Sequence, residues 1–179
     1  SREQHDLARA RVARAGLAER VEIRLMDYRD LRERFDRVVS IEMFEAVGYA
    51  YYDDYFVTLD RALLPGGRAF LQTITVPDEG FHRYRLKSDW IRRHVFPGSL
   101  LASVEEIRKS LRRATGLSIA RLTEIGPHYV PTLQAWRRRF HDRLGEVRAL
   151  GYDARFTRLW DYYLASCEAG FAEGVIGNV

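Results

Sequence analysis

The chain has 179 residues, of which 46% are hydrophobic and 30% charged, with one cysteine and a formal net charge of +4 that arginine supplies almost entirely. This composition is typical of one globular domain with its own core, and the single cysteine excludes an internal disulfide framework and fits a reducing compartment. No apolar run reaches the ~18 residues that span a bilayer, and no nucleic-acid recognition motif accompanies the basic residues, so we interpret the charge as a solvated surface in preference to a lipid-attracting one.

The first half of the chain alternates between strands and helices. Val38, Val39 and Ile41 are apolar and mostly β-branched, which is typical of a parallel strand covered on both faces. The pattern predicts, in chain order, a helix over Glu3–Ala15 that ends at Gly16, a strand over Val21–Met26, a buried strand over Phe35–Met43, a helix over Tyr51–Leu63, a turn at Pro65–Gly67, and a strand over Ala69–Val76.

The second half is mainly helical. Aromatic residues are scattered among basic ones over Asp78–Ala114, and Ser103 with Glu106 forms the sequence pattern of a capping box that opens a helix to about Ala114. The remaining elements are a candidate strand over Leu117–Leu122, a helix with Pro131 in its first turn, and a last helix that Asp153 caps and that carries Cys167 on its apolar face.

In this order of elements, strands alternate with helices and a helical segment follows the last strand. The order predicts an α/β fold, with a doubly wound sheet and an inserted substrate cap. Glu42 and Glu45 follow directly after the strand that begins at Phe35. Ligands of open α/β sheets bind at the carboxyl ends of the strands, so these two carboxylates mark a candidate site.

Five blocks of the sequence, taken in order, resemble the cyclopropane-fatty-acyl-phospholipid synthases and the mycolic-acid cyclopropane synthases. The blocks are Ser40–Gly48, Leu71–Thr75, Tyr84 with Trp90–Ile91 and Phe96–Gly98, Tyr129 with Thr132–Phe140, and Tyr162–Phe171. The resemblance covers the chain to about Asn178 and implies the C-terminal part of a Rossmann-like class I methyltransferase sheet with a helical substrate-cap insertion. It divides a single partial domain into a cofactor-side α/β half (1–76), a helical acyl-binding insertion (77–114) and a C-terminal strand and helices (115–179).

The Gly-rich loop with which the family holds the methionine end of its cofactor has no counterpart in the sequence. We therefore expect a C-terminal fragment of a longer enzyme that by itself binds S-adenosylmethionine (SAM) poorly. The family's first two strands are also missing, so we expect the strand at Phe35 to expose apolar residues and an unpaired edge.

The resemblance implies SAM-dependent methylene transfer to the cis double bond of unsaturated phospholipid acyl chains, which forms a cyclopropane ring with a bound bicarbonate as base. It implies a cytoplasmic protein at the inner membrane surface, with lipid acyl chains and no nucleic acid as partners, and leaves a homodimer open. Two alternatives remain: a related methyltransferase with another acceptor, and an inactive lipid-binding fragment.

The resemblance also assigns the site residues. For catalysis they are Glu45, which hydrogen-bonds bicarbonate, Gln72, where many members have histidine, Ile74, which contributes its backbone, Tyr129, which donates from the other side, and Cys167, at the position of a family cysteine. For the cofactor they are Gln4 near the ribose, Asp27, Tyr28 and Arg29 at the adenine, and Ile41 in the same pocket.

Three of these residues also have a purely structural interpretation. Glu45 could only complement a helix dipole, Gln72 could be an ordinary polar residue at a strand end, and Tyr129 could be a buried tyrosine with a satisfied hydroxyl. We expect Glu45 to matter far more than Glu42, and Cys167 to pack as a small apolar side chain. The five histidines show no metal-ligand spacing.

Overall fold

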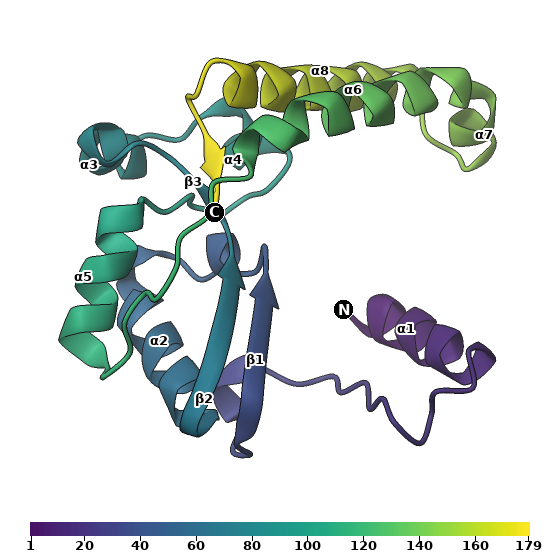
Figure 1. Cartoon of the computed structure of the whole chain (residues 1–179). Helices are drawn as coiled ribbons and strands as arrows, with labels where there is room; N and C mark the ends of the chain where they lie inside the picture. The colour runs from purple at the N-terminus through teal and green to yellow at the C-terminus, as the bar shows by residue number, and fades with distance from the viewer.

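The two longest strands of the chain lie side by side and run in the same direction (Figure 1). The computed structural model describes residues 1–179. Its helices and strands are α1 (Arg2–Arg14), β1 (Phe35–Ile41), α2 (Tyr52–Arg61), β2 (Leu63–Gln72), β3 (Ile74–Thr75), α3 (Phe81–Arg85), α4 (Trp90–His94), α5 (Val104–Ala114), α6 (Gly126–Asp142), α7 (Leu144–Ala149), α8 (Ala154–Ala172) and β4 (Gly177–Asn178). Four short 3₁₀ helices are η1 (Tyr28–Asp30), η2 (Phe44–Ala46), η3 (Tyr49–Tyr51) and η4 (Asp78–Gly80).

Strand β1 is an edge strand, because β2 is its only partner. Val38 packs on the core that α2 supplies, whereas Val39 and Ile41 on the other face are 62% and 59% exposed. The prediction that this strand is covered on both faces is therefore wrong within these residues. The expectation of exposed apolar residues and an unpaired edge is confirmed, since nothing in the chain lies against that face.

The predicted turn at Pro65–Gly67 lies inside β2. Phe35 pairs with Leu63 and Arg37 with Arg68, so the register shifts across this segment. A side chain on Gly67 would bring its Cβ within 2.8 Å of the Leu64 carbonyl oxygen, so this bulge requires a glycine.

The predicted strand over Ala69–Val76 is divided between two sheets. Strand β2 ends at Gln72, and β3 then pairs antiparallel with β4 at the C-terminal end of the chain. Thr73, at the junction, exchanges two backbone hydrogen bonds with Val179 and is fully buried. The chain end is thus fixed beside the carboxyl end of β2.

Two predicted strands are absent. Val21–Met26 and Leu117–Leu122 are irregular, and Val21, Leu25 and Leu122 are all more than a third exposed. Alternating apolar residues make a strand only where a neighbour accepts the backbone hydrogen bonds, and neither segment lies beside one.

The helix boundaries agree in part with the sequence. Asp153 caps α8, as predicted, by accepting from the Phe156 N–H at 2.8 Å. Ser103 caps α5, but the Glu106 carboxylate that should complete the capping box accepts from Tyr49 instead.

The placement of Pro131 in the first turn of its helix is wrong. Helix α6 begins five residues earlier at Gly126, with Pro127 in its first turn and Pro131 in its interior. Proline suits the first turn of a helix because the N–H groups there have no partner within the helix, and Pro127, the second residue of α6, takes that place.

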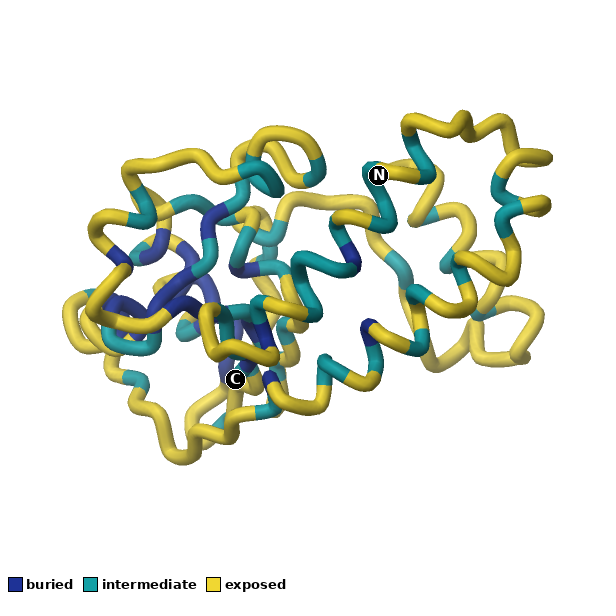
Figure 2. Tube along the Cα trace, turned by 90° about the horizontal axis from the view of Figure 1, so that it is seen from above, coloured by how far each residue is buried: buried dark blue, intermediate teal, exposed yellow.

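The main core lies between α2, α5 and the segment after β1. Phe44 is fully buried and packs against the rings of Tyr52, Tyr55 and Phe56. A smaller cluster joins α6 and α8, which lie side by side above the sheet, while α1 lies apart from the body (Figure 1). Figure 2 shows that the buried segments gather mostly on one side of the molecule, away from the N-terminus. None of the helices is long and apolar enough to cross a membrane.

Candidate active site

Four segments that are distant in the sequence meet at the carboxyl ends of β1 and β2. They are the turn after β1 that carries Glu42 and Glu45, the junction at Gln72–Ile74, the start of α6 with Tyr129, and β4 with Asn178. The crossover of the chain from one sheet to the other brings them together.

The Glu45 carboxylate is held by groups from the end of β2. Its Oε1 accepts from the Thr73 hydroxyl at 2.9 Å and from the Ile74 N–H at 2.6 Å. Its Oε2 is buried and has no hydrogen-bond partner. A buried acceptor without a partner is costly, so Oε2 is positioned to receive a donor from a ligand. The backbone of Ile74 contributes here, through its N–H to Glu45.

The Glu42 carboxylate is the centre of a second network. Its Oε1 accepts from the Tyr129 hydroxyl at 2.5 Å, from the Asn178 amide at 2.9 Å and from the Gln72 amide at 3.3 Å. The Gln72 amide also donates to the Tyr129 oxygen at 3.1 Å. Two residues that the resemblance assigned to catalysis, Gln72 and Tyr129, are therefore brought together, but on Glu42.

Glu42 also has an unusual backbone. Its φ of 49° is the only positive φ of a residue other than glycine in the chain. Its N–H donates to the Gln72 carbonyl oxygen at 2.9 Å, which extends the β1–β2 ladder by one residue. The ladder and the carboxylate network together hold Glu42 in a conformation that side chains rarely adopt.

Glu42 has more hydrogen-bond partners at the site than its sequence position indicates, and Asn178 is a site residue that the sequence does not predict. The expectation that Glu45 matters far more than Glu42 stays a prediction. Asn178 is fully buried, and its Oδ1 has no hydrogen-bond partner. Its signal lies only in the pairing of β4 with β3, which the local sequence does not indicate.

The Tyr129 ring stacks on Phe171 of α8, with ring centroids 4.9 Å apart. Burial and the hydrogen bond to Glu42 raise the pKa of Tyr129 to about 12. The phenol is therefore neutral at physiological pH, and its single proton is directed to Glu42.

Cys167 lies in the apolar cluster between α6 and α8, together with Ile74, Tyr129 and Tyr163. Burial raises the pKa of the Cys167 thiol to about 11. A thiol with so high a pKa is a poor nucleophile at neutral pH, and the geometry favours the packing role that we expect for it.

We expect Cys167→Ser in the full-length protein to keep most of any activity that this site supports and to lose about 1–3 kcal/mol of stability, since a hydroxyl replaces a thiol in an apolar cluster. A hydrogen bond to a carbonyl one turn earlier would reduce that loss. The check is turnover at saturating lipid and cofactor beside a melting curve. A thousandfold fall in turnover with an unchanged melting curve would show that the thiol is catalytic.

Three of the proposed cofactor residues form one loop. Asp27 caps η1 and pairs with the Arg29 guanidinium at 2.7 Å, which lowers the pKa of Asp27 to about 2. Tyr28 packs edge-on against Tyr55, whose hydroxyl donates to the Ser40 hydroxyl oxygen of β1 at 2.7 Å.

Through Tyr55 and Ser40 this loop is tied to the face of β1 that packs on α2, whereas Ile41 lies on the opposite, exposed face. The structure does not bring Ile41 and this loop together, so their place at the adenosine part of the cofactor stays a prediction.

Gln4 lies elsewhere. It belongs to α1, where its amide oxygen accepts from the amino group of Ser1 at 3.2 Å in a capping box. The structure does not bring Gln4 to the other cofactor residues, so its place near the ribose stays a prediction.

Bicarbonate, the base that the resemblance implies, does not fit this arrangement. Both hydrogens of the Gln72 amide point to Glu42 and Tyr129, and the Tyr129 proton points to Glu42. The Thr73 hydroxyl and the Ile74 N–H are committed to Glu45. An anion placed here would face two carboxylates with almost no free donors.

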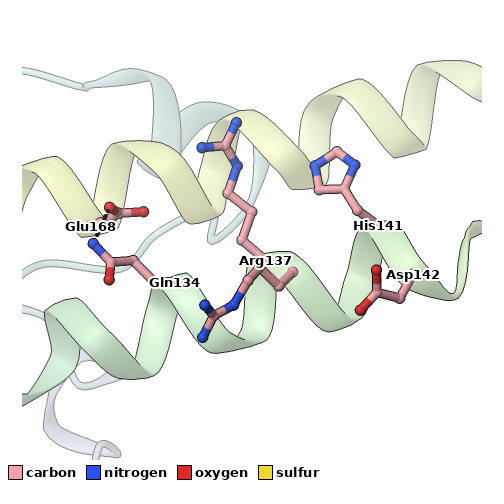
Figure 3. A pocket seen from close by; sticks show the side chains of 6 residues that line it. Gln134, Arg137, His141, Asp142 and Glu168 are labelled. Carbon is pink, nitrogen blue, oxygen red and sulfur yellow. Dashed lines mark hydrogen bonds between the residues drawn. The ribbon is translucent and has the colours of Figure 1, made fainter.

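A separate hollow of about 530 Å³ lies between α6 and α8 (Figure 3). It is lined by Gln134, Arg137, Arg138, His141, Asp142 and Glu168. Arg137 and His141 both bind the Asp161 carboxylate, at 2.6 and 2.7 Å, and Gln134 donates to Glu168. With no apolar lining, this hollow is unsuited to an acyl chain. No group of three or more histidine, cysteine or acidic side chains in the chain could hold a metal ion.

Comparison with known proteins identifies relatives over nearly the whole chain. The family model described as mycolic acid cyclopropane synthetase matches residues 1–178. A tuberculostearic acid methyltransferase of Mycobacterium tuberculosis is 45% identical over 174 residues, which are 97% of this chain and 41% of that protein. The cyclopropane-fatty-acyl-phospholipid synthase of Escherichia coli K12 is 40% identical over 152 residues, 84% of this chain and 38% of that protein. The chain thus spans about two fifths of the length of these relatives.

Solved structures agree with the predicted fold class. The crystal structure of a mycolic acid cyclopropane synthase complexed with SAH and CTAB matches 99% of this chain and 65% of its own, with a TM-score of 0.84 and 26% identity. A geranyl diphosphate methyltransferase in complex with SAM matches with a TM-score of 0.68 at 15% identity, which shows a shared fold alone. The prediction of a class I methyltransferase fold is confirmed, and the chain belongs to the mycolic acid cyclopropane synthetase family of SAM-dependent methyltransferases.

Proposed function

We propose that the protein transfers the methyl group of SAM to the cis double bond of an unsaturated phospholipid acyl chain and forms a cyclopropane ring. The observation that carries this proposal is the pair of carboxylates, Glu42 and Glu45, fixed at the carboxyl ends of β1 and β2. Glu45 keeps a buried oxygen without a partner, and Glu42 gathers three donors on one oxygen. Alkylation of an alkene creates a carbocation and then releases a proton, and carboxylates serve both steps.

SAM supplies an electrophilic methyl group when it is bound. Ile41 and the loop of Asp27 and Tyr28 would hold its adenosine part, as the family resemblance implies, and the loop is tied to β1 through Tyr55 and Ser40. The stacked rings of Tyr129 and Phe171 would stabilise a cation through their π faces. The fixed carboxylates would stabilise the same charge without reorganising.

A methyl-branched acyl chain is a second possible product, and one observation favours it. The relative that is 45% identical carries the name of a tuberculostearic acid methyltransferase, whereas the 40% identical relative is a cyclopropane synthase. Both chemistries begin with methyl transfer to an acyl double bond. Proton loss from the transferred methyl closes a ring, whereas proton loss from a neighbouring chain carbon leaves an open, branched chain. The position of the base would decide between them.

The proposed acceptor lies in a lipid bilayer, so we propose that the protein acts peripherally at the cytoplasmic face of the inner membrane. The formal net charge of +4 is compatible with this location, because basic residues near anionic headgroups each contribute about 1 kcal/mol, but the proposal rests on the acceptor.

The test is to incubate the full-length protein with methyl-labelled SAM and vesicles of a cis-unsaturated phosphatidylglycerol, with vesicles of a saturated lipid as control. Mass spectrometry of the released fatty acids would separate a cyclopropane from a methyl-branched chain. We expect label in a cyclopropane acyl chain and none in the saturated lipid. Label in a branched chain would favour the second product class, and no label in either lipid would reject both.

A further inference from the structure

We propose that the Glu42 carboxylate is the proton acceptor of the reaction and stands where this family would otherwise place a bicarbonate ion. The inference rests on the proposed function, and it adds a residue to the site. It implies an enzyme whose base belongs to the chain and whose turnover is independent of dissolved bicarbonate.

The hydrogen-bond donors around Glu42 are those that would hold the ion. Gln72 and Tyr129 are the side chains that the resemblance assigns to the ion, and both donate to Oε1 of Glu42. Asn178, which is fully buried, adds a third donor at 2.9 Å. A carboxylate and bicarbonate offer the same planar pair of oxygens, so one can take the place of the other among the same donors.

The two oxygens of the Glu42 carboxylate differ in their surroundings. Oε1 accepts all three hydrogen bonds, whereas no group of the chain binds Oε2. The Glu42 residue as a whole is exposed rather than enclosed in the core. One oxygen therefore anchors the carboxylate in a fixed direction, and the other is left to accept a proton.

The backbone conformation of Glu42 is also unusual. Glu42 has a φ of 49°, in the left-handed region that favours glycine, and no other residue except glycine in this chain has a positive φ. Such a conformation costs of order 1–3 kcal/mol and persists where the surroundings enforce it. A glycine would fit this position with less strain, so a carboxylate in this conformation points to a task for its side chain.

The reaction step balances with Glu42 as base. The π electrons of the double bond form the new bond to the methyl carbon, and the electron pair of the broken C–S bond stays on sulfur. The second alkene carbon becomes a cation. Oε2 of Glu42 then takes a proton from the transferred methyl group, and the electrons of that C–H bond close the ring. The proton leaves to water through the exposed side of the carboxylate.

The experiment replaces Glu42 with glycine in the full-length protein. Glu42→Gly removes the base, relieves the backbone and frees the donors of Gln72, Tyr129 and Asn178 for an added anion. We expect turnover to fall about 10²–10⁴-fold in bicarbonate-free buffer, and millimolar bicarbonate to restore much of it. The matched control is Glu42→Gln, which keeps the size of the side chain and leaves no space, so bicarbonate should not restore its activity.

A binding measurement gives a readout that is independent of turnover. The ¹³C NMR signal of labelled bicarbonate should broaden on addition of Glu42→Gly and should not broaden on addition of the wild-type protein or Glu42→Gln. A circular dichroism spectrum of each variant establishes that it is folded.

The outcomes separate this inference from the proposed function. Wild-type turnover that requires added bicarbonate, or wild-type broadening of the bicarbonate signal, would overturn the role of Glu42 while leaving methyl transfer intact. A folded Glu42→Gln variant with wild-type turnover would overturn it as well. A wild-type protein that methylates no unsaturated lipid would count against the proposed function and, with it, the catalytic part of this inference.

Discussion

Glu45→Gln in the full-length protein is expected to lower the rate of methyl transfer about ten- to a hundredfold, the equivalent of about 1.5–3 kcal/mol for a charge-assisted hydrogen bond. Oε1 of Glu45 accepts from Thr73 and Ile74, and a glutamine oxygen can keep both bonds. The buried Oε2 becomes an NH₂ group, so residue 45 loses its negative charge and its free acceptor together, while the Glu42 carboxylate remains. The turn should keep its shape, and the loss should appear in turnover more than in stability.

The measurement is initial rate with unsaturated vesicles at saturating SAM, beside a melting curve. The matched control is Glu105→Gln, since Glu105 lies in the first turn of α5 and pairs on the surface with Arg112 at 2.9 Å. That change should alter the rate less than twofold, because exposed ion pairs contribute about 0–1 kcal/mol and this pair is remote from the site. Equal rates for Glu45→Gln and the control would show that Glu45 serves the fold alone.

Glu42 has a larger set of hydrogen-bond partners in the structure than its place in the sequence suggests. In sequence, Glu42 is a carboxylate just past a strand, three residues from a family-matched one. In space, it accepts from Tyr129, Gln72 and Asn178, which are 87, 30 and 136 residues away along the chain. Local pattern carries no information about contacts at such separations, so the ranking of the two carboxylates could not be read from the sequence.

The features that the sequence predicts correctly depend on residues that are close together in the chain. Asp153 and Ser103 cap their helices because capping depends on residues one turn away. The prediction of a strand at Val21–Met26 is wrong, because a strand needs a neighbouring strand and none lies beside this segment. The prediction that β1 is buried on both faces is wrong for the same reason. On one face, Val39 and Ile41 are exposed and meet no other element.

The site residues also differ in whether the nearby sequence identifies them. Gln72 and Tyr129 were identified through blocks that match the family, and the structure places them 3.1 Å apart. Asn178 lies in a two-residue strand that forms only because β3 is there to pair with it. Its side chain had no local signal, although it completes the network on Glu42.

Phe44→Ala is expected to destabilise the full-length protein by about 3–5 kcal/mol, a large fraction of the stability of an ordinary domain. Phe44 is fully buried, and its ring lies 4.4, 4.8 and 5.2 Å from those of Tyr52, Tyr55 and Phe56. Alanine would leave a cavity in the middle of this aromatic cluster. Phe44→Leu keeps most of the volume and should lose clearly less, so the pair separates a packing effect from any change at this position.

The loss of the Phe44 ring should also affect the site. Phe44 lies between Glu42 and Glu45 in the sequence, and its side chain anchors their turn in the core. The check is urea unfolding followed by near-ultraviolet circular dichroism, with Leu150→Ala as control, since Leu150 is 77% exposed. The control should shift the unfolding free energy by less than about 0.5 kcal/mol. Similar losses for Phe44→Ala and Leu150→Ala would mean that this cluster does not hold the turn. The carboxylates would then take their positions from the hydrogen bonds at the end of β2 alone.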